Sequence, residues 1–284
     1  MITFWQNIPL YLNPIIFTLG NFSFRWYSLG YLLVLATIYF MLKKRFQKIA
    51  STNFTFDQLE NILLFSFLGA LLGGKIGYIL FYDWSNFINN PLMSFSPFLN
   101  GKFVGIYGMS FHGGLLGAIL FGWLICRKYK LNFYQILNFI IPVFPLGYFW
   151  GRMGNFMNGE LYGRITTSKI GMHFSQVDAK QNILRHPSQL YEAFGEGILL
   201  FFILRYFTEK TKWQNKMFPL FLIFYGLIRF IIEFFRQPDP QLGFIALNWL
   251  TMGQILCMVM IGVGTVILIF NSKFSIFKQF SNKQ

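Results

Sequence analysis

The chain has 284 residues, of which 55% are hydrophobic, 21% aromatic and only 12% charged, and its formal net charge is +14. This composition, with apolar runs long enough to cross a bilayer core of ~30 Å, indicates a protein that crosses the membrane several times rather than a soluble domain. The positive charge does not indicate a nucleic-acid partner, because no soluble segment carries a basic stripe with interleaved aromatic residues.

Seven apolar segments are predicted to be transmembrane helices. The expected fold class is therefore an all-α polytopic membrane protein, with a single integral membrane domain over residues 1–284. The segments are 26–42, 59–82, 111–126, 135–151, 190–206, 217–235 and 251–271. Two connections, 83–110 and 152–189, are long, and long loops in a compact protein are often functional. We expect these loops to form a small cap over a site on their side of the membrane.

Basic residues predict the orientation, because Lys and Arg beside short loops mark the cytoplasmic face. With seven helices, the basic clusters at 43–48, 127–130, 205–216 and 273–283 fall on one side. The N-terminus and the long loops are therefore expected outside and the C-terminus in the cytoplasm, where the basic loops should attract anionic membrane lipids. The first apolar segment lacks the basic region and cleavage site of a signal peptide, so it should remain as a span.

Tyr27 lies at the start of the first span, where a tyrosine either anchors the helix at the interface or directs its hydroxyl into a site.

In the second and third spans glycine recurs at every fourth residue, which predicts that another helix packs closely there. These glycines are Gly69, Gly73 and Gly77, then Gly113 and Gly117. Lys75 lies among them and either extends to the interface or contacts an anion. His112 opens the third span as a candidate proton acceptor, although a lone histidine at a helix end is more often structural.

The segment 151–164 ends the fourth span with a concentrated set of polar residues. It contains Arg152, Asn155, Asn158, Glu160 and Arg164. Polar and charged side chains are energetically unfavourable beside lipid, so their position at the end of an apolar helix predicts a polar site at the outer membrane boundary.

The segment 186–192, which leads into the fifth span, favours a plainer interpretation, with Ser188 as a helix cap and Glu192 in the first turn. A gating or peptide-contacting role is the alternative.

The sixth span ends with Arg229, Glu233 and Arg236 on one helical face, before Pro238 terminates the helix. A simple Arg229–Glu233 pair would only neutralise two buried charges. Several arginines at the outer boundary, with few carboxylates beside them, favour a functional cluster instead. Guanidinium groups stay charged and donate paired hydrogen bonds to phosphate oxygens, so the predicted ligand is the phosphate of an anionic phospholipid.

These motifs resemble one known family. Residues 151–163 match the pattern Gly-Arg-x-Gly-Asn-Phe-x-Asn-x-Glu-x-x-Gly of bacterial prolipoprotein diacylglyceryl transferases, and the likeness continues in family order through nearly the whole chain. The further matching segments are 26–27, 73–78, 109–114, 186–192, 229–239 and 252–254. Lys75 departs from the pattern, because members of this family often carry arginine there and lysine lacks the bidentate fork.

The resemblance implies an activity. The diacylglyceryl group of phosphatidylglycerol is transferred to the thiol of the lipobox cysteine in a prolipoprotein signal peptide, and glycerol phosphate is released. The enzyme is expected in the bacterial inner membrane, as a monomer without a cofactor. We expect no metal either, because the three histidines show no ligand spacing.

The family's functional positions fall on residues of these motifs. The resemblance implies catalytic roles for His112, Glu160, Arg229 and Glu233, and phospholipid-binding roles for Tyr27, Arg152, Asn155 and Gly163, to which we add Arg236. Arg152 and Arg229 suit the phosphate that gains negative charge as the leaving group departs. The base that deprotonates the thiol is His112, Glu160 or Glu233, of which we favour His112, while either carboxylate could orient an arginine instead.

Two other functions fit the same residues. A carrier or channel for an anionic solute would use the arginines to bind and release it, and product formation separates an enzyme from such a carrier. An intramembrane phospholipid hydrolase would release diacylglycerol to water. A substrate peptide with serine in place of cysteine separates the transferase from this hydrolase.

Overall fold

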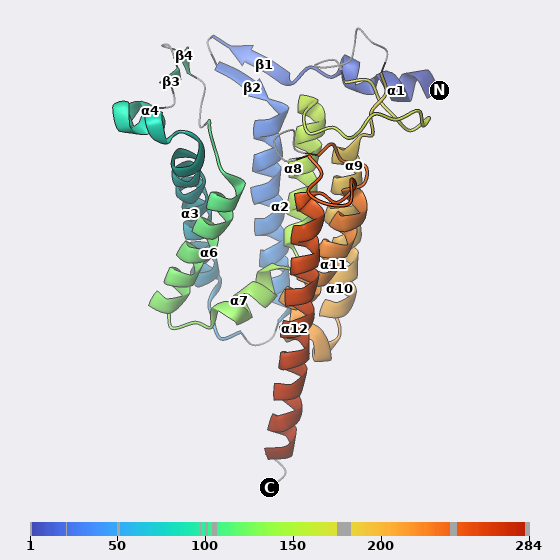
Figure 1. Ribbon diagram of the computed structural model, residues 1–284. Helices are drawn as coiled ribbons and strands as arrows, with labels where there is room; N and C mark the ends of the chain where they lie inside the picture. The colour runs from blue at the N-terminus through green and yellow to red at the C-terminus, as the bar shows by residue number, and fades with distance from the viewer. Residues whose placement is uncertain are drawn as a thin grey trace. The chain divides into compact units, whose positions relative to one another are not determined.

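The computed structural model describes residues 2–20, 22–49, 52–96, 98–99, 102–103, 107–174, 183–238 and 243–281. Most of these residues are helical, in agreement with the predicted fold class. The chain divides into two compact units, Lys43–Ile136 and the combination of Met1–Leu42 with Leu137–Gln284, whose elements are labelled in Figure 1. The single integral domain expected from the sequence stays a prediction.

In the unit Lys43–Ile136, the helices α3 (Phe56–Tyr82) and α6 (Phe111–Lys128) pack along each other in opposite directions. The glycines at every fourth residue of α3 and α6 make this close approach possible. A Cβ on Gly73 would collide with the carbonyl oxygen of Gly113 and would lie 2.9 Å from the Cα of Gly117. The close packing predicted from the glycine spacing is therefore confirmed.

The connection between α3 and α6 carries short elements. They are α4 (Trp84–Asn89), α5 (Pro91–Phe95) and a hairpin of β3 (Phe98–Leu99) with β4 (Lys102–Phe103). Lys75 of α3 contacts the end of this connection: its Nζ donates to the Tyr107 carbonyl at 3.0 Å and lies 4.6 Å from the centre of the Tyr107 ring. A carbonyl and an aromatic ring thus compensate the burial of this charge, a partnership that the sequence did not suggest.

The other unit contains the remaining long helices, which run side by side in Figure 1. They are α2 (Trp26–Lys48, of which the part up to Leu42 belongs to this unit), α8 (Phe144–Asn158), α10 (Leu200–Thr208), α11 (Met217–Ile232) and α12 (Met252–Ser281). Helix α7 (Phe133–Ile140) precedes α8, and η2 (Thr211–Lys216) precedes α11. Helix α9 (Ser188–Glu192) continues through a π-helix, η1 (Ala193–Leu199), into α10.

Small residues, a polar contact between helices and an apolar cluster contribute to the packing in this unit. A Cβ on Gly30 of α2 would lie 3.2 Å from the Trp150 carbonyl oxygen, so α2 and α8 are in close contact. The indole Nε1 of Trp150 also donates to Thr37 Oγ1 at 2.9 Å. An apolar cluster buries Ile141, Leu200, Leu204, Met217 and Leu220. These contacts hold rigid helices on which polar side chains can be placed with little freedom.

The segment before α2 contains structure that the sequence analysis did not predict. Helix α1 (Ile2–Tyr11) is followed by an antiparallel hairpin of β1 (Ile15–Leu19) and β2 (Phe22–Arg25). The Trp5 indole Nε1 donates to the Ile170 carbonyl at 3.0 Å, and the His173 amide donates to the Gln6 carbonyl at 2.8 Å. Helix α1 therefore packs on the described part of the loop 159–187. The cap expected from residues 83–110 and 152–189 stays a prediction.

Four described helices are long and apolar enough to cross a membrane. They are Trp26–Lys48, Phe56–Tyr82, Trp213–Ile232 and Met252–Asn271. The pair α7 and α8, bent by 58° at the break between them, would be a fifth span. Large apolar side chains are exposed on these helices, including Phe40 at 66% and Phe81 at 79%, as expected of surfaces that face lipid. The predicted segments 111–126 and 190–206 are helical but fall outside this set, so the count of seven stays a prediction.

The contact between α3 and α6 generates a stability prediction. Gly73→Ala should lower the free energy of unfolding by about 1–3 kcal/mol, because the new methyl group meets backbone atoms that cannot move aside. Gly262→Ala is the matched control, since a Cβ at this α12 position would meet nothing within 4 Å. Thermal unfolding in detergent measures both variants. Equal unfolding temperatures for the two variants would contradict the packing argument.

Candidate functional site

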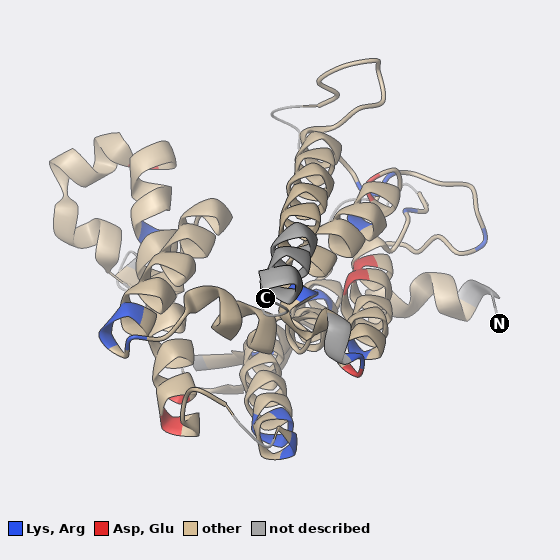
Figure 2. Ribbon diagram, turned by 90° about the horizontal axis from the view of Figure 1, so that it is seen from below, with Lys and Arg blue, Asp and Glu red and all other residues tan. Residues whose placement is uncertain are grey.

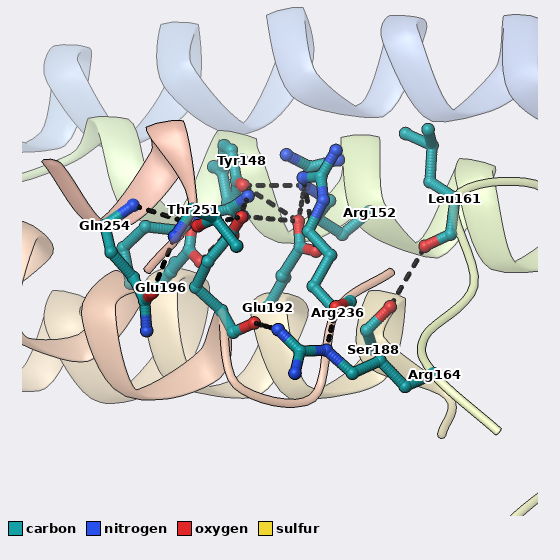
Figure 3. A network of polar contacts seen from close by, with 12 residues as sticks. Tyr148, Arg152, Leu161, Arg164, Ser188, Glu192, Glu196, Arg236, Thr251 and Gln254 are labelled. Atoms are coloured by element: carbon teal, nitrogen blue, oxygen red, sulfur yellow. Dashed lines mark hydrogen bonds and ion pairs between the residues drawn. The ribbon is translucent and has the colours of Figure 1, made fainter. Parts of the chain in front are cut away.

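A buried carboxylate, Glu192, lies at the centre of an ionic network in the unit Met1–Leu42 with Leu137–Gln284. Its side chain is fully buried at the end of α9. One oxygen, Oε2, lies 2.7 Å from Arg152 Nε of α8 and 3.1 Å from Arg229 Nη1 of α11. The Tyr148 hydroxyl donates to the same oxygen at 3.3 Å. Figure 3 shows these contacts converging from different helices.

Arg229 is held by three carboxylates. In addition to Glu192, its Nη1 lies 3.3 Å from Glu196 Oε1, and its Nη2 lies 2.9 Å from Glu233 Oε2. The Arg229–Glu233 pair, separated by one helical turn, is the plain alternative that the sequence leaves open, and the structure forms it as part of the wider network. Glu196 belongs to the π-helix η1, a form of helix that occurs frequently at functional sites.

A third arginine approaches Glu192 from the turn after α11. Arg236 Nη1 lies 3.7 Å from Glu192 Oε1, the carboxylate oxygen that the other two arginines do not contact. The main chain here is held by Arg164, whose Nε donates to the Arg236 carbonyl at 2.8 Å and whose Nη2 donates to the Glu233 carbonyl at 3.3 Å. Arg164 therefore supports the network through the backbone and does not itself contact Glu192.

Gly163 brings the polar segment 151–164 against this turn. Its amide donates to the His186 carbonyl at 2.8 Å, and it forms an isolated antiparallel bridge with Arg236. A Cβ on Gly163 would collide with the Phe235 carbonyl oxygen and lie 2.7 Å from the His186 carbonyl oxygen. The structure thus uses this glycine for close backbone approach.

A second chain of polar contacts extends from Arg152 along α8. Arg152 Nη1 donates to Asn155 Oδ1 at 3.3 Å, and Asn155 Nδ2 donates to Glu160 Oε1 at 2.8 Å. The amide of Asn155 thereby separates the guanidinium from the carboxylate. Tyr27 contacts this chain from α2: its hydroxyl pairs with that of Tyr31 at 3.0 Å and also interacts with the Asn155 side chain.

The network carries more carboxylates than the sequence analysis expected. Arg152, Arg229 and Arg236 are matched by Glu192, Glu196 and Glu233, so the six side chains sum to zero formal charge. The expectation of arginines with few carboxylates beside them is therefore wrong. Charges buried this deeply must be paired, and an anionic ligand would have to compete with the glutamates for guanidinium donors.

The interpretation of the segment 186–192 is also corrected. Pro187 occupies the N-cap position of α9 without a side-chain hydrogen bond, whereas the Ser188 hydroxyl donates to the Leu161 carbonyl at 3.0 Å. Glu192 belongs to the ionic network instead of completing a helix start. The His186 ring contacts the Tyr191 hydroxyl through Nδ1 at 3.1 Å, and burial lowers the pKa of His186, which favours the neutral ring.

The structure brings together eight of the nine predicted site residues in one unit. They are Tyr27, Arg152, Asn155, Glu160, Gly163, Arg229, Glu233 and Arg236. His112 belongs to the unit Lys43–Ile136, where it is exposed in the first turn of α6 with its ring 5.7 Å from the Phe111 ring. Its role as the base stays a prediction.

Sequence reasoning missed Glu196 and Tyr148, and it gave Glu192 too small a part. A signal was present: Glu192 and Glu196 are four residues apart inside the apolar segment 190–206, so they share a helical face. Carboxylates in such a segment require partners, and the arginines at the outer boundary were available. Tyr148 precedes Arg152 by one helical turn, a position typical of a side chain that contacts it.

Comparisons with known proteins agree with the motifs. A family model described as "Prolipoprotein diacylglyceryl transferase" matches residues 14–270. A phosphatidylglycerol--prolipoprotein diacylglyceryl transferase of Chlorobaculum tepidum is 47% identical over 277 residues, which cover 95% of this chain and 94% of the relative. Relatives of the same name from Rickettsia felis and Legionella pneumophila are 45% and 44% identical. Those alignments cover 90% and 89% of this chain, and 96% and 94% of the relatives.

The network around Glu192 generates a second stability prediction. Glu192→Gln should lower the free energy of unfolding by about 3–5 kcal/mol, because the arginines around it would lose a fully buried counter-charge. Glu209→Gln is the control: this residue forms an exposed pair with Arg205 at 3.4 Å, and its loss should change stability by less than about 1 kcal/mol. Thermal unfolding of the two variants in one detergent compares them. A Glu192→Gln variant as stable as Glu209→Gln would refute a structural role for the network.

Proposed function

Because the chain belongs to the prolipoprotein diacylglyceryl transferase family, we propose that it transfers the diacylglyceryl group of phosphatidylglycerol to the cysteine thiol of a prolipoprotein. The observation that carries this proposal is the convergence of Arg152, Arg229 and Arg236 on one buried point beside the 151–163 motif. The names of the relatives do not favour a carrier, a channel or a hydrolase.

The proposed reaction joins sulfur to carbon and releases phosphate. The thiolate of the lipobox cysteine attacks the glycerol carbon that bears the phosphate oxygen, so that a carbon–sulfur bond forms as the carbon–oxygen bond breaks. The bonding electrons leave with glycerol phosphate, a phosphate monoester, and the thiol proton goes to a base. The protein must therefore stabilise negative charge that grows on phosphate oxygens in a site poor in water.

Guanidinium groups are suited to this task, and the network already positions them. We propose that Arg152 and Arg229 donate to the phosphate in the transition state, with Arg236 beside them. Glu192 holds both arginines in the absence of ligand, so phosphate binding exchanges one anion for another without exposing an unpaired cation. Glu233 fixes Arg229 from the opposite side.

The remaining site residues have supporting roles in this proposal. Asn155 and Tyr27 position the headgroup, Glu160 orients Asn155, and Gly163 permits the close backbone contact with the Arg236 turn. His112 deprotonates the incoming thiol. Cys126 and Cys257 are both buried, in accord with a reaction in which the peptide supplies the sulfur.

The substrates determine where the protein works. We propose a monomer in the bacterial inner membrane with seven spans, the N-terminus outside, the C-terminus in the cytoplasm and the site towards the outer face. The 83–110 and 152–189 loops would cap that site. A two-tailed lipid and a signal peptide then reach the arginines from within the bilayer.

Product analysis tests the function. The purified full chain, in phosphatidylglycerol vesicles with a lipobox peptide, should yield a thioether-linked diacylglyceryl peptide and an equal amount of glycerol phosphate, both measured by mass spectrometry. A peptide with serine in place of the cysteine should yield neither. Glycerol phosphate released with the serine peptide would indicate a hydrolase, and no product with either peptide would refute the proposal.

Substitution of the arginines tests their roles. Arg229→Lys and Arg152→Lys should each lower kcat about 100-fold, because lysine keeps the charge but loses the paired donors. Arg205→Lys, in an exposed pair, is the control that should keep wild-type kcat. Initial rates of peptide lipidation measure all three variants. If both Arg229→Lys and Arg152→Lys lipidate the peptide at the wild-type rate, paired hydrogen bonds from these arginines do not contribute to catalysis.

A further inference from the structure

Two helices of this chain begin with the same hydrogen-bonded arrangement. At α3, the Gln58 amide donates to Thr55 Oγ1 at 3.2 Å, and the Thr55 amide donates to Gln58 Oε1 at 2.9 Å. At α12, the Gln254 amide donates to Thr251 Oγ1 at 3.2 Å, and the Thr251 amide donates to Gln254 Oε1 at 3.0 Å. Both are capping boxes, which satisfy backbone donors at a helix start.

The two boxes differ in their surroundings. Thr55 is exposed, whereas Thr251 is only 2% exposed, and its hydroxyl donates to Glu233 Oε1 at 3.1 Å (Figure 3). A threonine hydroxyl has one proton. Because the Thr251 oxygen accepts the Gln254 amide, its proton is directed to the carboxylate, and Glu233 is the acceptor in this contact.

The first turn of α12 also fixes Glu233 by shape. A Cβ on Gly253 would lie 2.6 Å from Glu233 Oε1, so a larger residue here would require the carboxylate to move from its position. The N-terminal end of a helix favours a negative charge. Helix α12 therefore contributes a hydroxyl donor, a close backbone contact and its dipole to one carboxylate oxygen.

The other oxygen of Glu233 accepts Arg229 Nη2 at 2.9 Å. Both oxygens thus act as hydrogen-bond acceptors, Oε1 towards Thr251 and Oε2 towards Arg229. A carboxylate fixed at both ends can rotate little, so it transmits the position of α12 to the guanidinium of α11. This arrangement suits Glu233 to orienting Arg229 rather than to serving as the base that accepts the thiol proton.

We propose that Thr251 is a positioning residue of the site, which acts through Glu233 to fix the guanidinium of Arg229. The inference rests on the proposed function for the role of Arg229, but the contact it invokes is independent of any substrate. A plain helix cap would need only the oxygen of Thr251. A positioning residue needs its proton as well, and this difference can be tested.

Aspartate at position 251 distinguishes a helix cap from a positioning residue. Its carboxylate can accept the amide hydrogen bond of the cap, but it has no proton to donate to Glu233. Thr251→Asp should lower kcat by about 10- to 100-fold, the size of loss that a misplaced reacting group causes. Thr251→Ser keeps both oxygen and proton and should stay within about threefold of wild-type kcat. Thr55→Asp is the matched control in the second box and should keep wild-type kcat. If the Thr251→Asp variant has the same kcat as Thr55→Asp, Thr251 acts only as a helix cap and the proposal is overturned.

A double-mutant cycle tests the contact without substrate, so that a failure of the proposed function does not obscure it. Thermal unfolding is measured for Thr251→Asp, Glu233→Gln and the double variant. Aspartate at position 251 faces a carboxylate in one background and a neutral amide in the other, so Glu233→Gln should relieve the destabilisation that Thr251→Asp causes. Additive effects would show that the two side chains do not interact, and would overturn the inference even in an active enzyme.

Discussion

The burial of charge in an apolar protein is the constraint on which the rest of this structure depends. Guanidinium and carboxylate groups taken out of water are stable only when each finds partners of opposite charge. Here α8, α9, η1 and α11 deliver these partners to one another around Glu192. The helices that carry the charges are therefore tied together by the same contacts that hold the arginines in place.

In the unit that contains Glu192, two close backbone approaches at glycine residues help to position the charged side chains. Gly163 lets the 151–163 motif approach the turn at Arg236, and Gly253 lets α12 approach Glu233. In the ribbon of Figure 2, the acidic positions are few among the uncharged residues, which are drawn in tan. Backbone carbonyls also take part, because Arg164 donates to the carbonyls of Arg236 and Glu233.

Periodicity explains which site features could be predicted. The Arg229–Glu233 contact joins residues one helical turn apart, where spacing determines proximity, so the sequence could suggest it as one interpretation. The contacts of Glu192 with Arg229, Arg152 and Arg236 join residues 37, 40 and 44 positions apart in the chain, so no local pattern indicates them. The helix α1 and the β1–β2 hairpin are not predicted because neither has the length of a span, and α1 contacts the 159–187 loop, which is distant in sequence, through Trp5 and Gln6.

The sequence alone determined the membrane class, the family and nearly all residues of the proposed site, because apolar length, glycine spacing and a long motif are local properties. It also indicates that Arg229 and Glu233 share one helical face. Only the tertiary structure decided which charges meet: that Glu192 and Glu196 neutralise the arginines, and that Thr251 contacts Glu233. The physical reason is that pairing between helices depends on how backbones pack, and an ion pair forms only where that packing brings two side chains within a few ångströms.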